Sequence, residues 1–512
     1  MSSESETNLL FTKILATLGP ASGSVATIRE LIGAGARAFR VNFSHGTFDD
    51  HSRVIANIRT ASDEVGESVA IVGDLCGPKM RVGKVADDGV ELRAGMRVEF
   101  QKPDVVTSAP DAGAPVVFST TYPDLVDEVK PRQRVLLDDG KVALVCVGAE
   151  GEGEGRRLIC EVVNGGKITS SKGVNLPETE LSTSSLTDKD RECVKFAVDN
   201  AFDFLALSFV RTRGDVLHLK DCLREMGVSV GVPRSDTDTG VDRAVADPHG
   251  SMPIISKIEK PQALEDIDGI IHESDVIMVA RGDLGVEMDV AEVPVIQKKL
   301  ISRCHEHGRP VIVATQMLES MIEAPTPTRA EVSDVANAIV DGADVVMLSG
   351  ETAVGKWPVN AVRVMNRVAG HTNQFVRSRS IPISTPREKE EQTAALAHGV
   401  ASMARGLDAK LVVLWTQFDG SVVYLSQKRL DAPILACCSR PDFLRRMQLL
   451  HGVEPVPMDE PESPADFLRH TDALIQEKGW AAEGDSIVYV LGDRMGKRNL
   501  SNLVYIHQVG NL

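Results

Sequence analysis

The fold of this chain is decided by residues 254–287, IISKIEKPQALEDIDGIIHESDVIMVARGDLGVE. This stretch holds two short apolar runs of strand type, separated by a segment with helical character. Lys257 and Glu259 stand at the end of the first run, and Arg281 and Asp283 follow the second. In parallel α/β folds, residues just past the carboxyl ends of the strands converge on one face, where ligands bind. The stretch therefore predicts two carboxylates and two cations on a common face.

The two carboxylates indicate a metal site. Glu259 and Asp283, with Gly282 leaving the backbone open, suit a hard divalent cation with oxygen ligands, Mg²⁺ or Mn²⁺. The alternative is that Lys257 and Glu259 form an exposed ion pair and that residues 281–283 are only a turn. Because the same arrangement recurs in two successive strand-to-helix junctions, the sequence favours the metal site.

Composition restricts the class of protein. The 512 residues are 43% hydrophobic and 25% charged, which is typical of a globular chain with two to four domains. With 56 Lys and Arg against 73 Asp and Glu, the net charge of −17 argues against a nucleic acid or a membrane surface as partner. The start of the chain shows no signal peptide. The eight cysteines lack CxxC spacing, so we expect reduced core residues of a cytoplasmic protein.

Strand-like runs followed by helical patterns recur along most of the chain. The eight predicted strands are residues 13–18, 38–42, 69–72, 204–209, 253–256, 276–280, 310–314 and 344–348. Eight such units predict an α/β fold, a closed (β/α)₈ TIM barrel. An open doubly wound sheet is the alternative, but polar motifs follow every strand and do not gather at one switch point.

Two further domains are predicted. Residues 78–182 carry short alternating runs without a long helix, which indicates a small β-barrel lid domain inserted into the barrel. The barrel then consists of residues 8–77 and 183–373, and residues 374–512 form a C-terminal α/β domain with an open sheet. Residues 229–252 show no apolar periodicity, and we expect an exposed loop there.

Polar residues after the strands predict an anionic substrate. In chain order they are Pro20, Arg40, Asn42, Ser44, His45, Asp74, Lys79, Arg81, Ser208, Lys257, Glu259, Asp283, Thr315 and Glu351. The cations exceed what the metal carboxylates need for pairing, and Arg, Lys and Mg²⁺ are suited to neutralising a transferring phosphoryl group. From the residues alone, we expect a metal-dependent barrel enzyme that acts on a phosphorylated or carboxylated small molecule.

Seven segments carry a resemblance to a known family. They are RVNFSHG (40–46), Asp74 with GPKMR (77–81), ISKIE (255–259), VARGDLG (279–285), ATQMLESM (314–321), PTPTRAEVSDVANA (325–338) and DGADVVMLSGETA (341–353). Together they resemble the pyruvate kinases, from about Lys13 to the end of the chain. The resemblance implies phosphoryl transfer from phosphoenolpyruvate to ADP, giving pyruvate and ATP, with a lid that closes over the barrel mouth and a homotetrameric assembly.

The resemblance also implies roles for individual residues. Glu259 and Asp283 would hold Mg²⁺, and Lys257 would stabilise charge on the transferring phosphoryl group and the enolate. Arg40 would contact the phosphoryl group, and Thr315 would line the methylene side, near the protonation route. Ser208 and Gly282 belong with the substrate-binding residues.

The nucleotide and a monovalent cation would occupy neighbouring positions. The resemblance assigns ADP to Pro20, Asn42, His45, Arg81 and Lys189, and the monovalent-cation pocket to Asn42, Ser44, Asp74, Leu75 and Lys79. Many family members need K⁺ and carry Glu where this chain has Lys79. Because an ammonium group can supply the charge of a bound cation, we expect K⁺ not to be required.

Other features leave alternatives open. The loop 416–421 contains Phe418 and Asp419, which are poor phosphate neighbours, so we do not expect activation by a sugar bisphosphate. Ser421 at a helix start, with Arg494 or Lys497 nearby, could still hold one phosphate. Glu351 is expected to be structural. The competing functions are a Mg²⁺-dependent lyase or aldolase acting on pyruvate, and an inactive regulatory paralogue.

Overall fold

The structure is a computed structural model, and it describes residues 9–110, 114–230, 251–377, 392–417, 420–492 and 502–511. Most of the predicted loop 229–252 lies outside these residues, although Ser229 and Ser251 at its two ends form a β-bridge. The proposed phosphate neighbours Phe418, Asp419, Arg494 and Lys497 also lie outside the described residues.

Eight parallel strands close into a barrel, as predicted. They are β1 (Lys13–Thr17), β2 (Ala36–Asn42), β3 (Ala70–Asp74), β12 (Phe204–Leu207), β13 (Ile254–Ile258), β14 (Val276–Ala280), β15 (Val311–Ala314) and β16 (Val345–Leu348). Neighbours in the barrel are neighbours in the chain, and β1 pairs with both β2 and β16. The carboxyl ends of all eight strands therefore open on one mouth.

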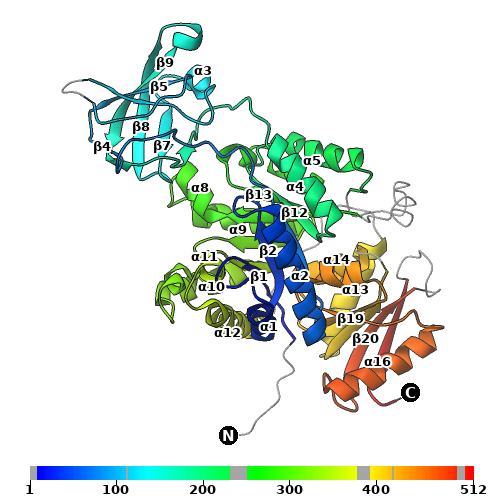
Figure 1. The fold of residues 1–512 in the computed structure, drawn as a ribbon. Helices are drawn as coiled ribbons and strands as arrows, with labels where there is room; N and C mark the ends of the chain where they lie inside the picture. Colours follow the sequence, from blue (N-terminus) through cyan, green and yellow to red (C-terminus); the bar gives the residue numbers. More distant parts are fainter. Residues whose placement is uncertain are drawn as a thin grey trace.

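Helices surround the barrel (Figure 1). They are α1 (Val25–Ala34), α2 (Phe48–Val65), α4 (Asp188–Asp199), α5 (Arg213–Glu225), α7 (Ile267–Glu273), α9 (Val293–Glu306), α10 (Arg329–Asp341) and α12 (Pro358–Arg377), with short helices α8 (Arg281–Glu287) and α11 (Gly350–Ala353) at the mouth. Capping boxes at Thr47, Thr187 and Thr328 start α2, α4 and α10, because each threonine satisfies a free N–H of the first turn.

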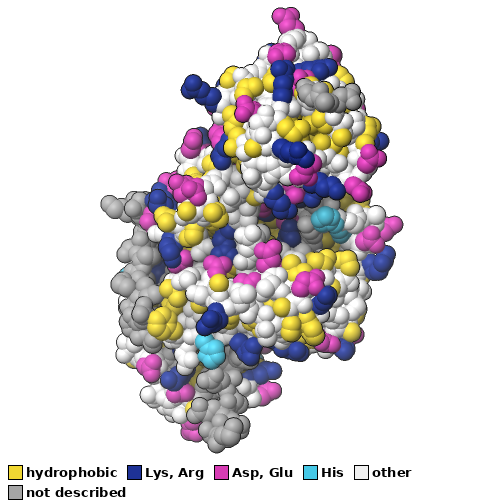
Figure 2. Space-filling model, turned by 90° about the vertical axis from the view of Figure 1, so that its left-hand side faces the viewer, with side chains coloured by type: hydrophobic (Ala, Val, Ile, Leu, Met, Phe, Trp, Pro, Cys, Tyr) yellow, Lys and Arg dark blue, Asp and Glu magenta, His cyan; other side chains and the backbone are white. Residues whose placement is uncertain are grey.

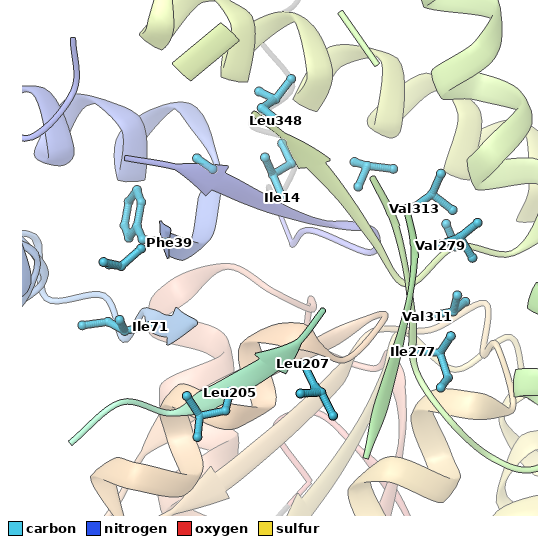
Figure 3. Close-up of a cluster of buried hydrophobic side chains, with 14 of the residues drawn as sticks. Ile14, Phe39, Ile71, Leu205, Leu207, Ile277, Val279, Val311, Val313 and Leu348 are labelled. Carbon is cyan, nitrogen blue, oxygen red and sulfur yellow. The ribbon is translucent and has the colours of Figure 1, made fainter. Parts of the chain in front are cut away.

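The barrel strands are buried on both faces. Side chains such as Leu15, Met278 and Ile312 fill the interior. Alternate residues such as Ile14, Ile277 and Val313 lie on the outer face, under the helices (Figure 3). This double burial explains why the strands are continuous apolar runs without alternation.

The lid is a curled β domain at the mouth of the barrel. Its strands are β4 (Val90–Leu92), β5 (Arg97–Gln101), β6 (Val116–Phe118), β7 (Arg134–Leu137), β8 (Val142–Glu150), β9 (Arg157–Asn164), β10 (Gly166–Ile168) and β11 (Val174–Asn175), with the short helix α3 (Leu125–Glu128). Six strands form one sheet in the order β11-β7-β8-β9-β5-β6, and β10 pairs with β4. The sequence predicted β5, β7, β8 and β9; the others are too short to show a period.

The C-terminal domain is an open α/β sheet at the opposite end of the barrel (Figure 1). Its order is β19 (Val453–Pro457), β18 (Ile434–Cys438), β17 (Leu411–Trp415), β20 (Ser486–Leu491) and β21 (Leu503–Gln508), with helices α13 (Gln392–Gly406), α14 (Gly420–Gln427), α15 (Pro441–Arg446) and α16 (Pro464–Lys478). The sequence predicts strands at residues 411–415, 434–437 and 486–491, which correspond to β17, β18 and β20, but it does not predict β19 and β21. Two prolines argue against a central strand in β19, but β19 is an edge strand, where proline is tolerated.

Polar contacts join this domain to the amino ends of the barrel strands. The buried Lys13 Nζ donates to Val453 O at 2.6 Å, and Arg445 pairs with Asp203 at 2.7 Å. All eight cysteines are free and buried, as predicted. Within the described residues, no helix is long and apolar enough to cross a membrane.

Candidate active site

Four charged side chains meet at the barrel mouth, and we call Arg40, Asp74, Lys257 and Glu259 the central charge cluster. Arg40 Nε donates to Asp74 Oδ2 at 2.6 Å. Lys257 Nζ lies 3.3 Å from Asp74 Oδ1 and 2.8 Å from Glu259 Oε1. The two carboxylates are buried, so two cations and two anions alternate in a low-dielectric site.

Burial and pairing act in opposite directions on the pKa values of this cluster. Burial alone would raise the pKa of Asp74, but Arg40 and Lys257 outweigh it and hold the pKa below its usual value. Burial would lower the pKa of Lys257, but Asp74 and Glu259 raise it above its usual value. Burial raises the pKa of Glu259, and the nearby charge of Asp283 adds to this effect. Lys257 opposes this rise only in part, so Glu259 is the less fully neutralised of the two buried carboxylates.

Ser208 holds Lys257 in place from the end of β12. Its Oγ donates to Leu75 O at 2.7 Å and accepts from Lys257 Nζ at 2.8 Å. The next residue, Phe209, donates its backbone N–H to Glu259 Oε2 at 2.8 Å. The two residues that follow β12 thus orient Lys257 in β13 and Glu259 directly after it.

Gly282 and Asp283 lie in the first turn of α8, which starts directly after β14. Thr315 Oγ1, after β15, accepts from Gly282 N at 2.7 Å and donates to Ala314 O at 2.6 Å. Thr315 has φ = 69°, a left-handed conformation that is rare for a β-branched residue and is typical of functional sites.

Arg281 has a structural role, and its carboxylate partner is Asp334. Arg281 Nη2 lies 2.7 Å from Asp334 and donates to Thr315 O at 2.9 Å. Glu351 is structural as well, because its carboxylate accepts backbone N–H groups from Leu318 at 3.0 Å and Ser349 at 2.7 Å.

The donor set at this mouth fits a magnesium ion. Mg²⁺ is commonly held by one or two carboxylates, with substrate oxygens and waters completing its octahedral shell. Glu259 and Asp283 are close enough for the charge of one to raise the pKa of the other. Among the described residues, no group of three or more His, Cys, Asp or Glu side chains could hold a metal alone. The pair thus suits an ion shared with a substrate.

A separate polar group lies beside the cluster on the β2 side. Asn42 Oδ1 accepts from Ser44 N at 3.1 Å, and Lys79 Nζ donates to Ser44 Oγ at 3.1 Å. Asp74, expected in the same pocket, is instead bonded to Arg40 and Lys257. The ammonium group of Lys79 therefore stands at the serine where the resemblance places a monovalent cation.

A cleft of about 360 Å³ separates the barrel mouth from the lid. Arg81, Asp283 and the lid residue Lys172 line it, and a neighbouring hollow is lined by Lys79, Arg81 and Lys189. Lys and Arg side chains gather in the recess between the lid, at the top of the view, and the barrel (Figure 2). This surface suits an anionic ligand with several phosphates.

The remaining nucleotide candidates lie at the rim. The pKa of His45 is lowered by partial burial and by nearby Lys79, Arg81, Arg40 and Lys189, so this imidazole is neutral near pH 7. Lys189, on α4, lies 3.4 Å from Phe43 O. Pro20 is exposed in the turn after β1, where its neighbour Ala21 donates to Ala353 O, and it does not contribute to the central charge cluster.

Several cleft residues were not predicted as site residues. Phe209 and Lys260 follow strand ends that were recognised, but nothing in their local pattern distinguished them. Asp138 and Asp139 also line the cleft, in left-handed conformations with φ of 52° and 55°. The Asp-Asp-Gly sequence of residues 138–140 is a hairpin-turn signal that could have placed them at the tip of the β7–β8 hairpin.

Comparison with known proteins identifies relatives of the whole chain. A family model described as "Pyruvate kinase, barrel domain" matches residues 10–232 and 228–362, and one described as "Pyruvate kinase, alpha/beta domain" matches residues 394–507. The pyruvate kinase of Mycobacterium intracellulare is 38% identical over 97% of this chain and 98% of its own length. That of Geobacillus stearothermophilus is 38% identical over 98% of this chain and 81% of its own length. A solved pyruvate kinase of Cryptosporidium parvum superposes with a TM-score of 0.85 and 31% identity, covering 99% of this chain and 98% of the other.

Proposed function

The chain belongs to the pyruvate kinase family, and we propose that its central charge cluster is where a phosphoryl group passes from phosphoenolpyruvate to ADP. The observation that supports this site is the buried alternation of Arg40, Asp74, Lys257 and Glu259 beside Asp283. Phosphoryl transfer depends on positioning and on electrostatic stabilisation of the equatorial oxygens. A buried lysine with fixed partners and a nearby arginine supply both.

Each residue has a role in this proposal. Glu259 and Asp283 would hold the divalent ion, which supplies neutralisation of negative charge on the substrate when bound. Lys257 remains protonated because two carboxylates raise its pKa, so it presents a fixed positive charge to the phosphoryl group and the enolate. Arg40 contacts the phosphoryl group, with its guanidinium oriented by Asp74. Thr315 lies on the methylene side, and Ser208 and Gly282 complete the substrate site.

The nucleotide would lie in the cleft between barrel and lid. Arg81 lines this cleft and Lys189 lines the hollow beside it, and Asn42, His45 and Pro20 belong to the barrel. The lid, which we delimit as residues 78–182, would exclude water during transfer, which limits hydrolysis of the phosphoryl group. A neutral His45 fits this role because it leaves the nucleotide phosphates to the lysine and arginine side chains.

We also propose that Lys79 replaces potassium. Its ammonium group bonds to Ser44, so the positive charge is already present without an added ion. Activity is therefore expected in K⁺-free buffer.

A single assay tests the reaction against its alternatives. Purified protein is mixed with phosphoenolpyruvate, ADP and Mg²⁺, and pyruvate and ATP are quantified separately. Equal amounts of both products are expected, and Asp283→Asn should abolish most of the rate because it removes a metal carboxylate. Pyruvate formed without ATP would identify a phosphatase instead. No turnover would exclude the proposed reaction and leave the pyruvate lyase or aldolase and the inactive paralogue, which differ in whether added pyruvate is consumed.

Assembly and compartment follow the family pattern in our proposal. We infer a homotetramer in the cytoplasm, in keeping with eight free cysteines. Light scattering coupled to size-exclusion chromatography measures the mass in solution, and a monomer at working concentration would contradict the tetramer.

A further inference from the structure

Phe209 holds a strained backbone conformation at the edge of the proposed metal site. Its φ is 55°, in the left-handed region, which is unfavourable for a bulky residue. Such a conformation persists only when surrounding contacts hold it. In this conformation the backbone N–H of Phe209 points at Glu259 Oε2, 2.8 Å away. The strained backbone therefore orients one oxygen of a proposed metal ligand.

The ring of Phe209 lies against the start of the lid. Gly77, the last barrel residue before the lid, has φ = 62°, and a methyl group added there would lie 2.6 Å from Cδ2 of the Phe209 ring. The same methyl group would lie 3.2 Å from Cβ of Ser208. Gly77 is itself tied to α4, because its N–H donates to Asp190 Oδ1 at 3.3 Å. Gly77, at the junction of barrel and lid, therefore leaves no room for a side chain beside the aromatic ring.

The other side of the ring borders the cleft. Phe209 lines the cleft between barrel and lid together with Lys260 and Asp283. The Lys260 ammonium lies 5.9 Å from the ring centroid, within the range of a cation–π contact. The ring of Phe209 thus lies beside Gly77 and near the Lys260 ammonium.

We propose that Phe209 is a positioning residue that couples the lid hinge at Gly77 to the orientation of Glu259. This inference rests on the proposed function, because it takes Glu259 as a metal ligand. Removing the ring would free residue 209 to relax to negative φ, and its N–H would turn away from the carboxylate. A movement of the hinge would have the same effect, so the affinity for the divalent ion would depend on the position of the lid.

The test measures Mn²⁺ binding to the full-length protein without substrates, by the electron paramagnetic resonance signal of free Mn²⁺. Loss of one charge-assisted hydrogen bond predicts that Phe209→Leu weakens the Mn²⁺ Kd by about tenfold. Gly77→Ala should weaken it to a similar degree, because the added methyl displaces the ring. In the double variant Gly77→Ala with Phe209→Leu, the two losses of Mn²⁺ affinity should not multiply, because both substitutions break the same contact. Phe209→Tyr keeps the ring and should retain the affinity.

The controls separate this inference from the proposed metal site. Phe375→Leu, a change of an exposed aromatic on α12, should leave Mn²⁺ binding unchanged. If Glu259→Gln binds Mn²⁺ as tightly as the wild type, the proposed metal site is wrong. If Glu259→Gln loses binding but folded Phe209→Leu and Gly77→Ala keep wild-type affinity, the coupling through Phe209 is wrong. Multiplying effects in the double variant would also overturn it, and thermal unfolding of each variant reports whether the fold is intact.

Discussion

Lys257→Met removes the only cation that bridges the two buried carboxylates of the central charge cluster in the described structure. Methionine has a similar length but no charge, so Asp74 keeps Arg40 and Glu259 loses its ion pair. Removing one partner of a buried ion pair costs about 3–5 kcal/mol of folding free energy. A fixed cation at a transferring phosphoryl group contributes about 10³-fold or more to kcat, or about 4 kcal/mol.

The cost in unfolding free energy depends on pH. In the variant, burial raises the pKa of Glu259 without opposition from a lysine. A carboxyl group whose folded pKa lies above its unfolded value binds more protons in the folded state, so stability is lost as pH rises. The difference in unfolding free energy between wild type and Lys257→Met should therefore be larger at pH 8 than at pH 5.5. Urea unfolding at both pH values measures it.

A matched control separates stability from chemistry. Lys220 on α5 is as buried as Lys257, with 8% against 9% of the residue exposed, and it pairs with Glu273 at 2.7 Å, away from the barrel mouth. Lys220→Met should lose stability but keep kcat within about twofold, because Lys220 belongs neither to the central charge cluster nor to the lining of the cleft. A coupled assay at saturating phosphoenolpyruvate, ADP and Mg²⁺ gives kcat for both variants. A kcat of Lys257→Met within tenfold of the wild type, in folded protein, would refute the role given to Lys257.

Three further results are expected. Thr315→Ala leaves the Gly282 N–H without its acceptor and should lower kcat by about tenfold, whereas Thr315→Ser should restore most of it; equal rates in both variants would contradict the role of the hydroxyl group. Lys79→Glu removes the ammonium group beside Ser44, so K⁺ should activate the variant several-fold while the wild type changes by less than about twofold; strong K⁺ activation of the wild type would refute the replacement. Burial and Arg429 lower the pKa of His305 to about 3, below its unfolded value, so the unfolded state binds more protons and stability should fall as pH drops below about 6.5. His305→Gln should flatten that dependence in thermal unfolding between pH 7 and 5, and an unchanged slope would show that other groups cause it.

Apolar runs and helix-capping residues predicted most of the barrel, because each depends on burial or hydrogen bonding within one strand or helix. The run at residues 276–280 is apolar on both faces, and β14 is buried on both faces. The pattern of residues 188–200 predicts a helix, which agrees with α4, whose start carries a capping box. The same reasoning did not predict β19, since its prolines argue against a strand until the sheet edge is known.

The chemistry of the site was only partly visible in the sequence. Glu259 and Asp283 stand out because each follows an apolar run, but the sequence does not show which residues pair with Lys257. Lys257 contacts Asp74, 183 positions earlier in the chain, and no local pattern reports such a contact. The left-handed conformation of Phe209 was likewise hidden, because a phenylalanine gives no sign of positive φ.

The sequence by itself determined which residues stand at strand ends, and therefore which charges and oxygen ligands reach the barrel mouth. Only the tertiary structure decided which of them pair, how deeply they are buried and what faces them from the lid. The physical reason is that periodicity depends on neighbours within a few residues, whereas ion pairing and desolvation depend on distances between strands that closure of the barrel brings together.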